Sequence, residues 1–435
     1  MAIGNVIRRI GFWTIDFLKG EGVRKHYREI SSILENPFSS KSTKRREEML
    51  TDLLLHSVET VPFYSSFNAT ALEEFPVVKK SIIQKDLEQF KSSKYRGKKL
   101  YKVATSGSTG TPFYLYQNTN KRKRNTADVL YFFSKVGHKL GDRLYELEVW
   151  RDHNKKDKIK VWMQNVVRFD VSKLTDSRIN FFLQLLNKDK HYKTFLGFSS
   201  SYESICQYLD KLDQKLSIKN VRSIIAGSEY LNSYTKIAMG KYFNAPVFSK
   251  YSNEELGILA HQTISSGENF KINWASYFIE LLDMEKDEPV KKGQMGRIVI
   301  TDLFNYSMPI IRYDTGDVAK FSMNNGEHLH FEHIEGRKMD LIYDTKGNIL
   351  SSFVVYTKFH PYYSLLKQYQ FIQEGVKCYT IKLNVHDSFP FEQQLVEDVK
   401  KDFGEDAKVK IIYVDEIPPL SSGKRKKVLS LLNKK

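Results

Sequence analysis

The chain has 435 residues, 41% of them hydrophobic and 13% aromatic, so it can bury the apolar surface that folding requires. Its net charge of +17 is compatible with nucleic acid, a membrane surface or an anionic substrate, but no helix-turn-helix, zinc-finger or aromatic RNA-binding pattern is present, which argues against nucleic-acid binding. No apolar run approaches the roughly 20 residues that cross a bilayer, and we expect a cytoplasmic protein.

The first 60 residues are predicted to be helical. Arg8, Arg9 and Asp16 interrupt the apolar residues near the N-terminus, unlike a signal peptide. The apolar residues that recur at helical spacing there are Ile3, Val6, Ile7, Ile10 and Trp13. Such a helix either covers a domain core, the interpretation we favour, or lies on a membrane. Membrane contact is expected only through this helix.

Strand and helix patterns then alternate without an internal repeat, which predicts an α/β fold. The predicted strands include Tyr101–Thr105, Phe113–Gln117, 223–226 and 297–301. The predicted helices include 126–136 and 202–212. Residues 91–160 hold 18 Lys and Arg against 6 Asp and Glu, which indicates either a solvated basic face or attraction of a polyphosphate.

The last 95 residues are predicted to form a separate small α+β unit. Its strands lie near 379–384 and Lys408–Tyr413, around a polar helix at Glu392–Phe403. The expected division is therefore a large domain of mixed sheets and helices over 1–340, including the helical segment 1–60, and a C-terminal domain over 341–435.

The loop 106–112 (Ser-Gly-Ser-Thr-Gly-Thr-Pro) places four hydroxyls and two glycines between two predicted strands. Glycine lets the backbone approach a bulky anion, and hydroxyls with free N–H groups bind its oxygens. The loop lacks the Gly-Lys-Ser/Thr ending of a Walker loop and precedes a strand rather than a helix. It is either a different phosphate loop or an ordinary hairpin turn.

Five motifs in order resemble those of the adenylate-forming superfamily of acyl-CoA synthetases. They are 106–112, 251–255 (Tyr-Ser-Asn-Glu-Glu), 311–317 (Ile-Arg-Tyr-Asp-Thr-Gly-Asp), 336–340 (Gly-Arg-Lys-Met-Asp) and 419–424 (Pro-Leu-Ser-Ser-Gly-Lys). Segments 60–64, 75–80 and 308–313 resemble the phenylacetate-coenzyme A ligase branch and its capsule-biosynthesis CapK-like members. The resemblance implies the superfamily's fold, with a mobile C-terminal lid domain.

The resemblance also implies roles for individual residues. The β- and γ-phosphates of ATP would be bound by Ser106, Gly107, Ser108, Thr109, Gly110 and Thr111. Adenine and ribose would be bound by Gly227, Ser228, Glu229, Tyr251, Ser252, Asp317 and Arg337. Within that set Tyr251 would stack on adenine, and Asp317 would accept hydrogen bonds from both ribose hydroxyls. Asp340 would be the hinge.

Two residues are implied to be catalytic. Lys424 would be the adenylation lysine, although the basic run 424–427 would otherwise be a solvated tail. Glu255 would bind Mg²⁺ or orient the phosphates, and because the family's motif differs here, Glu254 is an alternative. The acyl pocket is expected to include Phe198, Ser199 and Tyr230.

The implied reaction is attack of a carboxylate on the α-phosphorus of ATP, release of pyrophosphate, and acyl transfer to coenzyme A. A sugar or amine acceptor in surface-polysaccharide synthesis, or a homologue that binds nucleotide without turnover, are alternatives. The cysteines Cys206 and Cys378 lack metal-site spacing and are expected to be reduced. His261 has no nearby cysteine, and no zinc is expected.

Overall fold

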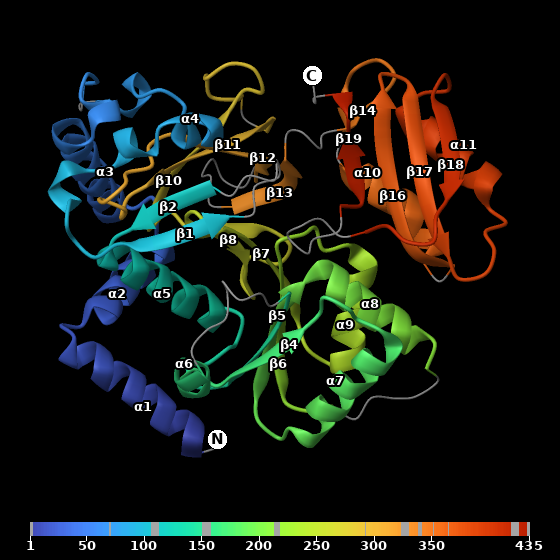
Figure 1. Ribbon diagram of the computed structural model, residues 1–435, viewed down its shortest axis with the longest axis horizontal. Coiled ribbons are helices and arrows are strands. Elements are labelled where there is room, and N and C mark those ends of the chain that lie inside the picture. The colour runs from blue at the N-terminus through green and yellow to red at the C-terminus, as the bar shows by residue number, and fades with distance from the viewer. Residues whose placement is uncertain are drawn as a thin grey trace.

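The computed structural model describes most of the chain as a mixed α/β protein (Figure 1). The described residues are 3–68, 71–105, 113–149, 158–212, 218–291, 293–322, 330–337, 342–350, 352–363, 365–418 and 426–432. Side chains at a few further positions in these ranges, including 336 and 337, are not described. The predicted fold class is confirmed.

The N-terminal part combines helices with one large sheet. Its helices are α1 (Ile3–Leu18), α2 (Gly22–Glu35), α3 (Ser40–Thr60), α4 (Lys80–Lys85), α5 (Thr119–Ser134), α6 (Lys158–Met163), α7 (Asp176–Lys188), α8 (Ser199–Asp210) and α9 (Ser233–Phe243). The strands β1 (Tyr101–Thr105) and β2 (Phe113–Gln117) form an antiparallel pair in which Thr105 lies opposite Phe113. The predicted bounds of these two strands are confirmed.

The large sheet has the order β10-β11-β12-β13-β9-β8-β7-β6-β5-β3-β4. Its strands are β3 (Arg143–Glu148), β4 (Val166–Asp170), β5 (Lys193–Phe198), β6 (Val221–Gly227), β7 (Val247–Asn253), β8 (Gly257–Gln262), β9 (Phe270–Ile272), β10 (Tyr277–Leu282), β11 (Met295–Asp302), β12 (Tyr313–Phe321) and β13 (His330–Arg337). Strands β3 to β7 are parallel, whereas the strands from β8 to β13 pair antiparallel.

Two apolar cores lie against this sheet. In one, α7, α8 and α9 supply Phe182, Ile205 and Met239, which pack with Phe195 and Ile224 of the parallel strands. The other core joins α2, α3 and α5 to the antiparallel strands. Because each helix presents an apolar stripe, burial of these stripes against the sheet explains the α/β packing.

Part of the predicted basic face is buried. Lys121 of α5 forms a 2.8 Å ion pair with Asp302, and both side chains are fully buried. Arg124, also fully buried, pairs with Glu29 of α2 at 2.6 Å and donates to Ser276 at 2.8 Å. These two cations therefore fix α5 to α2 and to the sheet, rather than facing solvent or an anionic ligand.

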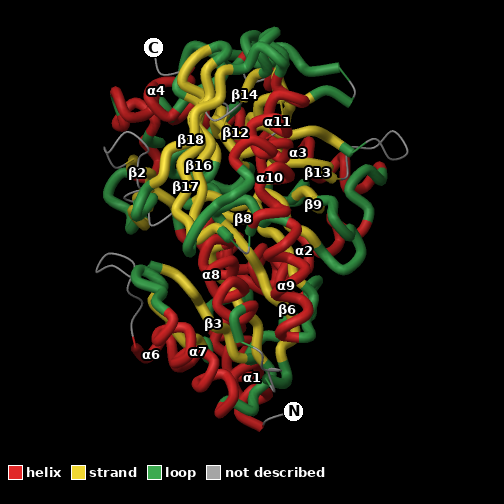
Figure 2. The backbone as a smooth tube through the Cα atoms, turned by 90° about the vertical axis from the view of Figure 1, so that its right-hand side faces the viewer, coloured by secondary structure: helices red, strands yellow, loops and turns green. Residues whose placement is uncertain are grey.

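The C-terminal part has its own four-stranded sheet in the order β18-β17-β16-β19. Its elements are β14 (Ile342–Tyr343), β15 (Ile349–Leu350), α10 (Ser352–Phe359), β16 (Leu366–Gly375), β17 (Cys378–Val385), α11 (Glu392–Phe403), β18 (Lys408–Tyr413) and β19 (Val428–Ser430). A third apolar core lies under α10 and α11. Figure 2 shows this sheet beside the part that carries α8.

The expectation that α1 covers a core with its isoleucines is wrong. Ile3, Ile7 and Ile10 are exposed, while Phe12 and Trp13 are only partly buried against the neighbouring core. In Figure 1, α1 lies at the lower left edge of the molecule. No described helix is long and apolar enough to cross a membrane.

Candidate active site

The carboxyl ends of three parallel strands bring several predicted site residues together. Phe198 at the end of β5 pairs with Gly227 at the end of β6, and Gly227 pairs with Lys250 of β7, directly before Tyr251. Ser199 begins α8 immediately after β5. Loops that follow parallel strands meet at one edge of a sheet, the usual position of a ligand site in α/β proteins.

A hydrogen bond joins two of the predicted residues across the fold. The Tyr251 hydroxyl donates to Oδ2 of Asp317 at 2.7 Å. In the sheet, β13, β9 and β8 lie between β12 and β7, so the sheet curves to bring the two side chains into contact. Burial, and secondarily the Asp317 carboxylate, raise the pKa of Tyr251 well above its ordinary value, so the phenol stays protonated and donates.

A bulge in β12 positions Asp317. Arg297 of β11 lies opposite Val318 and Val299 lies opposite Asp314, so three residues of β12 face the single residue Ile298. Inside the bulge, the Thr315 hydroxyl donates to the Ile298 carbonyl at 3.0 Å and accepts from the Asp317 amide at 3.2 Å. Such a bulge re-aims side chains within a strand.

The residue before Asp317 has a conformation that suits glycine. Gly316 has a φ of +76°, and its amide donates to Oδ1 of Asp314 at 2.8 Å. Oδ2 of Asp314 accepts from Arg297 at 2.7 Å. The Asp-Thr-Gly-Asp sequence thus forms a locally fixed turn that ends at the carboxylate of Asp317.

The structure distinguishes the two adjacent glutamates. Glu254 is exposed, whereas the side chain of Glu255 is only 11% exposed and lies 4.0 Å from Nζ of Lys80. Burial raises the pKa of Glu255, with Lys80 acting in the opposite direction and Glu254 and Asp317 adding to the rise. Glu255 therefore faces the interior near Asp317, and Glu254 faces solvent.

Lys80 lies beside the candidate site, although the motifs assigned it no role. It begins α4, and its ammonium lies 4.9 Å from the centre of the Phe113 ring in β2. The Glu255 carbonyl accepts from Gln117 of the same strand at 2.9 Å. These contacts bring the β1–β2 pair, and hence the ends of the predicted phosphate loop, close to Glu255. The only signal for Lys80 was its place in the segment 75–80.

The segment 227–229, predicted to bind adenine, is hydrogen-bonded to the start of α8, where the predicted acyl-pocket residue Ser199 lies. Oε2 of Glu229 accepts from the Ser200 amide at 2.9 Å, and the Ser199 hydroxyl donates to the Glu229 carbonyl at 3.1 Å. Glu229 thereby caps the N-terminus of α8. Ser228 before it has a φ of +69°, and Tyr230 after it is 38% exposed.

Several predicted residues are placed only in part. Arg337 lies opposite Asp317 in the β12–β13 ladder, but its side chain is not described. Ser252 lies on β7 next to Tyr251. The phosphate-loop positions 106–111, the hinge Asp340 and the lysine Lys424 lie outside the described residues.

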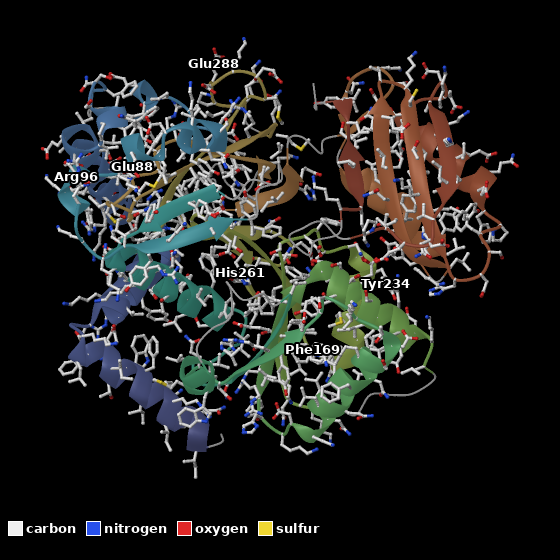
Figure 3. The ribbon with its side chains drawn as sticks, viewed as in Figure 1. Glu88, Arg96, Phe169, Tyr234, His261 and Glu288 are labelled. Carbon is white, nitrogen blue, oxygen red and sulfur yellow. The ribbon has the colours of Figure 1, made fainter. Side chains whose placement is uncertain are left out.

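The C-terminal sheet contacts the N-terminal part at α8 and α9. Lys427 pairs with Glu203 of α8, and Gln207 donates to the Leu366 carbonyl at 3.2 Å. The rings of Tyr234 and Tyr363 lie 5.1 Å apart; Figure 3 shows Tyr234 on the side that faces the C-terminal sheet. Glu203 is one helical turn from Ser199, so this contact lies next to the predicted acyl pocket.

His261 is a buried packing residue in the centre of the molecule (Figure 3). Its ring stacks on Phe132 with 5.8 Å between ring centres. Burial lowers its pKa to about 3, which keeps the imidazole neutral. Among the described residues, no group of three or more histidine, cysteine or acidic side chains could hold a metal ion.

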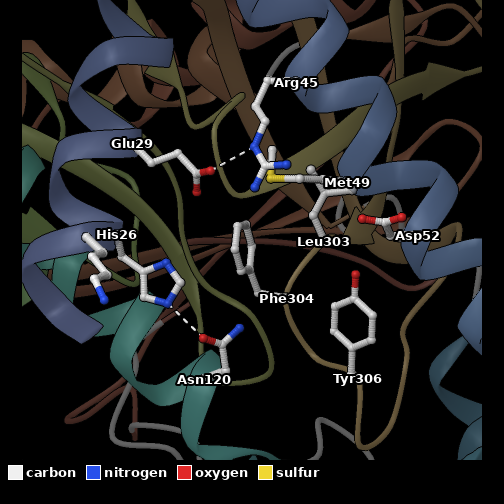
Figure 4. Close-up of a pocket in the computed structure, with 10 residues that line it drawn as sticks. His26, Glu29, Arg45, Met49, Asp52, Asn120, Leu303, Phe304 and Tyr306 are labelled. Atoms are coloured by element: carbon white, nitrogen blue, oxygen red, sulfur yellow. Dashed lines mark hydrogen bonds and ion pairs between the residues drawn. The ribbon is translucent and has the colours of Figure 1, made fainter. Parts of the chain in front are cut away.

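A separate cavity of about 340 Å³ lies between α2, α3 and the chain after β11 (Figure 4). Among the residues that line the cavity, His26 and Asn120 form a hydrogen bond of 2.9 Å, and Arg45 forms an ion pair with Glu29 at 2.9 Å. None of the predicted site residues that the structure describes lines this cavity. The candidate active site is therefore the strand-end region and not this cavity.

The chain is similar to known proteins. Residues 342–430 match the CapK C-terminal domain. Protein CapK of Staphylococcus aureus is 21% identical over 94% of this chain and 93% of that protein. The predicted resemblance to the adenylate-forming superfamily and its CapK-like members is confirmed.

Solved structures with the same fold are acyl-CoA ligases. One is 2-hydroxyisobutyryl-CoA ligase in the postadenylation state with R3-HIB-AMP (TM-score 0.73, 14% identity, 91% of both chains). Another is the anthranilate CoA ligase AuaEII with anthranoyl-AMP (TM-score 0.56, 16% identity, 74% of this chain and 65% of that one). At these identities the similarity establishes the fold.

The same 2-hydroxyisobutyryl-CoA ligase in its thioesterification state, with 2-HIB-AMP and CoA, gives a TM-score of only 0.59 over 90% of both chains.

Proposed function

We propose that this protein uses ATP to activate a carboxylic acid as its acyl-adenylate and then transfers the acyl group to an acceptor. The observation that carries the proposal is the Tyr251–Asp317 hydrogen bond of 2.7 Å, formed between β7 and β12 of a chain with the fold of acyl-CoA ligases. In the proposed complex the Asp317 carboxylate accepts hydrogen bonds from the ribose hydroxyls, and the Tyr251 ring stacks on adenine.

In the first half-reaction, a substrate carboxylate oxygen bonds to the α-phosphorus of ATP. The bond from the α-phosphorus to the bridging oxygen breaks, and the electron pair leaves with pyrophosphate. The hydroxyls and N–H groups of loop 106–111 would hold the β- and γ-phosphates. This step depends on positioning and on neutralising phosphate charge, so no serine or cysteine nucleophile is needed.

Glu255 has the properties of a Mg²⁺ ligand. Its carboxylate is nearly buried, the Lys80 ammonium lies 4.0 Å away, and its pKa is raised. A bound cation would relieve that unfavourable burial of negative charge. When bound, Mg²⁺ supplies positive charge to the phosphate oxygens. Lys80 is a further cation on the same side, close to the β1–β2 pair.

The arrangement of the C-terminal sheet supports a role for Lys424. The Phe371 amide of β16 donates to the Lys427 carbonyl at 2.8 Å, and the Lys427 ammonium pairs with Glu203. Lys427, three residues after Lys424 in the sequence, thus contacts α8, the helix that Ser199 begins. In the proposed role, the Lys424 ammonium reduces the repulsion between the substrate carboxylate and the α-phosphate.

Coenzyme A is the acceptor that we propose. Its thiol sulfur would bond to the acyl carbon and AMP would leave, giving a thioester. A homologous fold was solved with its acyl-AMP and CoA together, which supports this choice. A sugar amine or hydroxyl is the second candidate, because residues 342–430 match the CapK C-terminal domain.

ATP–pyrophosphate exchange tests the first half-reaction. Labelled pyrophosphate should enter ATP only when the correct carboxylic acid from a panel is present. Coenzyme A should then yield a thioester and release AMP; release only with an amine or sugar would identify the other acceptor class. Tight ATP binding without exchange for any acid would indicate a homologue that binds nucleotide without turnover.

A further inference from the structure

The first helix is held with its polar side inward. The buried residues of α1 are Asn5 and Asp16. The Asn5 amide donates to Asp142 at 3.0 Å, and the Asp16 carboxylate accepts from the amides of Val23 and Arg24 at 3.0 and 2.9 Å. Asp16 thus caps the first turn of α2. The one acidic group of α1 is therefore hydrogen-bonded inside the protein.

Close backbone packing fixes this orientation. A Cβ atom at Gly141 would lie 2.3 Å from the Asn5 carbonyl oxygen, and Gly141 has a φ of +96°. Only glycine allows α1 to approach the turn before β3 so closely. The helix therefore cannot rotate its isoleucines inward without losing these contacts.

An apolar stripe consequently faces away from the protein. Its residues recur at helical spacing, and each is at least 60% exposed: Ile3, Ile7, Ile10, Phe17 and Leu18. Trp162 of α6 is 69% exposed, and the guanidinium of Arg8 lies 5.6 Å from the centre of its ring. Such a stripe is the reverse of what a helix covering its own core presents.

Cations border the stripe. A hollow of about 500 Å³ beside it is lined by Arg9, Ile10, Trp13, Thr14, Phe17 and Arg24. The Arg24 guanidinium lies 5.1 Å from the Trp13 ring and also pairs with Glu21 at 3.4 Å. Guanidinium groups at the rim of an apolar surface match phosphate headgroups above acyl chains.

We propose that α1 seats this protein on a lipid bilayer that contains anionic headgroups. The apolar stripe enters the boundary between headgroups and acyl chains, while Arg9 and Arg24 bind lipid phosphates. Charge favours this occupant over a second copy of the chain, because a two-fold contact through the same face would bring its arginines together. The helix then lies in the plane of the surface and does not span it.

Vesicle flotation tests the proposal with the full chain. Vesicles of phosphatidylcholine alone are compared with vesicles in which about one third of the lipid is phosphatidylglycerol. We expect the unmodified protein to float with the anionic vesicles, and the double variant Ile7→Glu/Ile10→Glu to lose about tenfold or more of this binding. Arg9→Gln should weaken binding and reduce its dependence on salt.

Ile237→Glu is the matched control, because Ile237 is 69% exposed on α9 and lies outside the stripe. This variant should bind anionic vesicles as the unmodified protein does, and thermal melting should show that all variants fold. Failure of the unmodified protein to bind anionic vesicles would overturn the proposal, as would equal loss in the Ile237 variant. A dimer that the double variant dissociates, without vesicle binding, would instead identify the stripe as a contact between copies.

Discussion

Lys427 of the C-terminal sheet pairs with Glu203 of α8, and both side chains are largely withdrawn from solvent, with 17% and 9% exposure. Glu203 also accepts from Asn232 at 3.3 Å, and the Lys427 ammonium lies 4.8 Å from the centre of the Tyr369 ring. The last residue of the basic run 424–427 is therefore part of a contact between the two parts of the chain, and not of a solvated tail.

A double-mutant cycle should detect this contact. Replacing Glu203 or Lys427 with Gln leaves the partner's charge in a mostly buried position, and we expect each variant to lose about 1 to 3 kcal/mol of unfolding free energy. The loss in the double variant should be smaller than the sum of the single losses. Denaturant unfolding measures these values, and strictly additive losses would show that the two residues do not interact.

Asp317→Ala should weaken ATP binding about tenfold or more while the fold remains intact, because a charge-assisted acceptor for the ribose is lost. Tyr251→Phe keeps the ring and removes only the hydroxyl that bonds Asp317, so it should have a much smaller effect. Titration calorimetry measures both affinities. Unchanged ATP affinity in a folded Asp317→Ala protein would exclude the proposed role.

Glu255→Gln should slow pyrophosphate exchange about a hundredfold, whereas Glu254→Gln, at the adjacent exposed position, should leave it nearly unchanged. The two variants remove the same charge one residue apart, so general electrostatics cannot account for a difference. If Glu254→Gln had the larger effect, the assignment would pass to that residue.

The fall of the pyrophosphate-exchange rate at low pH, the acidic limb of its pH profile, should reflect protonation of Glu255. Burial raises the pKa of this carboxyl, so the ionised form that binds a cation is lost at a higher pH than for an ordinary glutamate. Lys80 opposes the shift, and Lys80→Gln should therefore move the limb to still higher pH. If the acidic limb remained at the same pH in Lys80→Gln and was still present in Glu255→Gln, it would have to arise from another group.

Lys424→Ala should nearly abolish acyl-adenylate formation, while a supplied acyl-adenylate is still consumed. Lys410→Ala is the control, because Lys410 is an exposed cation on β18 of the same sheet. The two half-reactions are to be measured separately. If both variants lost equally little acyl-adenylate formation, Lys424 would not have the proposed catalytic role.

Local pattern predicted some elements well and could not predict others. The bounds of β1, β2, α11 and β18 agree with the sequence interpretation, because each has a clear apolar period or sharp flanking residues. The Tyr251–Asp317 contact depends on the curvature of a sheet in which β9 pairs with β13, a strand distant in sequence, and no local pattern encodes that pairing or the curvature.

The orientation of α1 shows a second limit. Helical periodicity places its isoleucines on one face, but it does not say whether that face is turned inward. The deciding contacts, from Asn5 to Asp142 and from Asp16 to α2, are made by polar residues that a search for a core overlooks. Our proposal of Glu255 rather than Glu254 as the active-site glutamate likewise depends on the three-dimensional position of Lys80.

Because of the bulge in β12, the position of Asp317 depends on how many residues the bulge contains as well as on which residues they are. Three residues face Ile298, so deletion of one residue from 315–316 would shift Asp317 along the strand and reverse the side on which it projects. Substitutions that preserve the turn should be tolerated more readily than such a deletion. Changes in the length of related chains should therefore be found outside this segment, even where the amino acids within it differ.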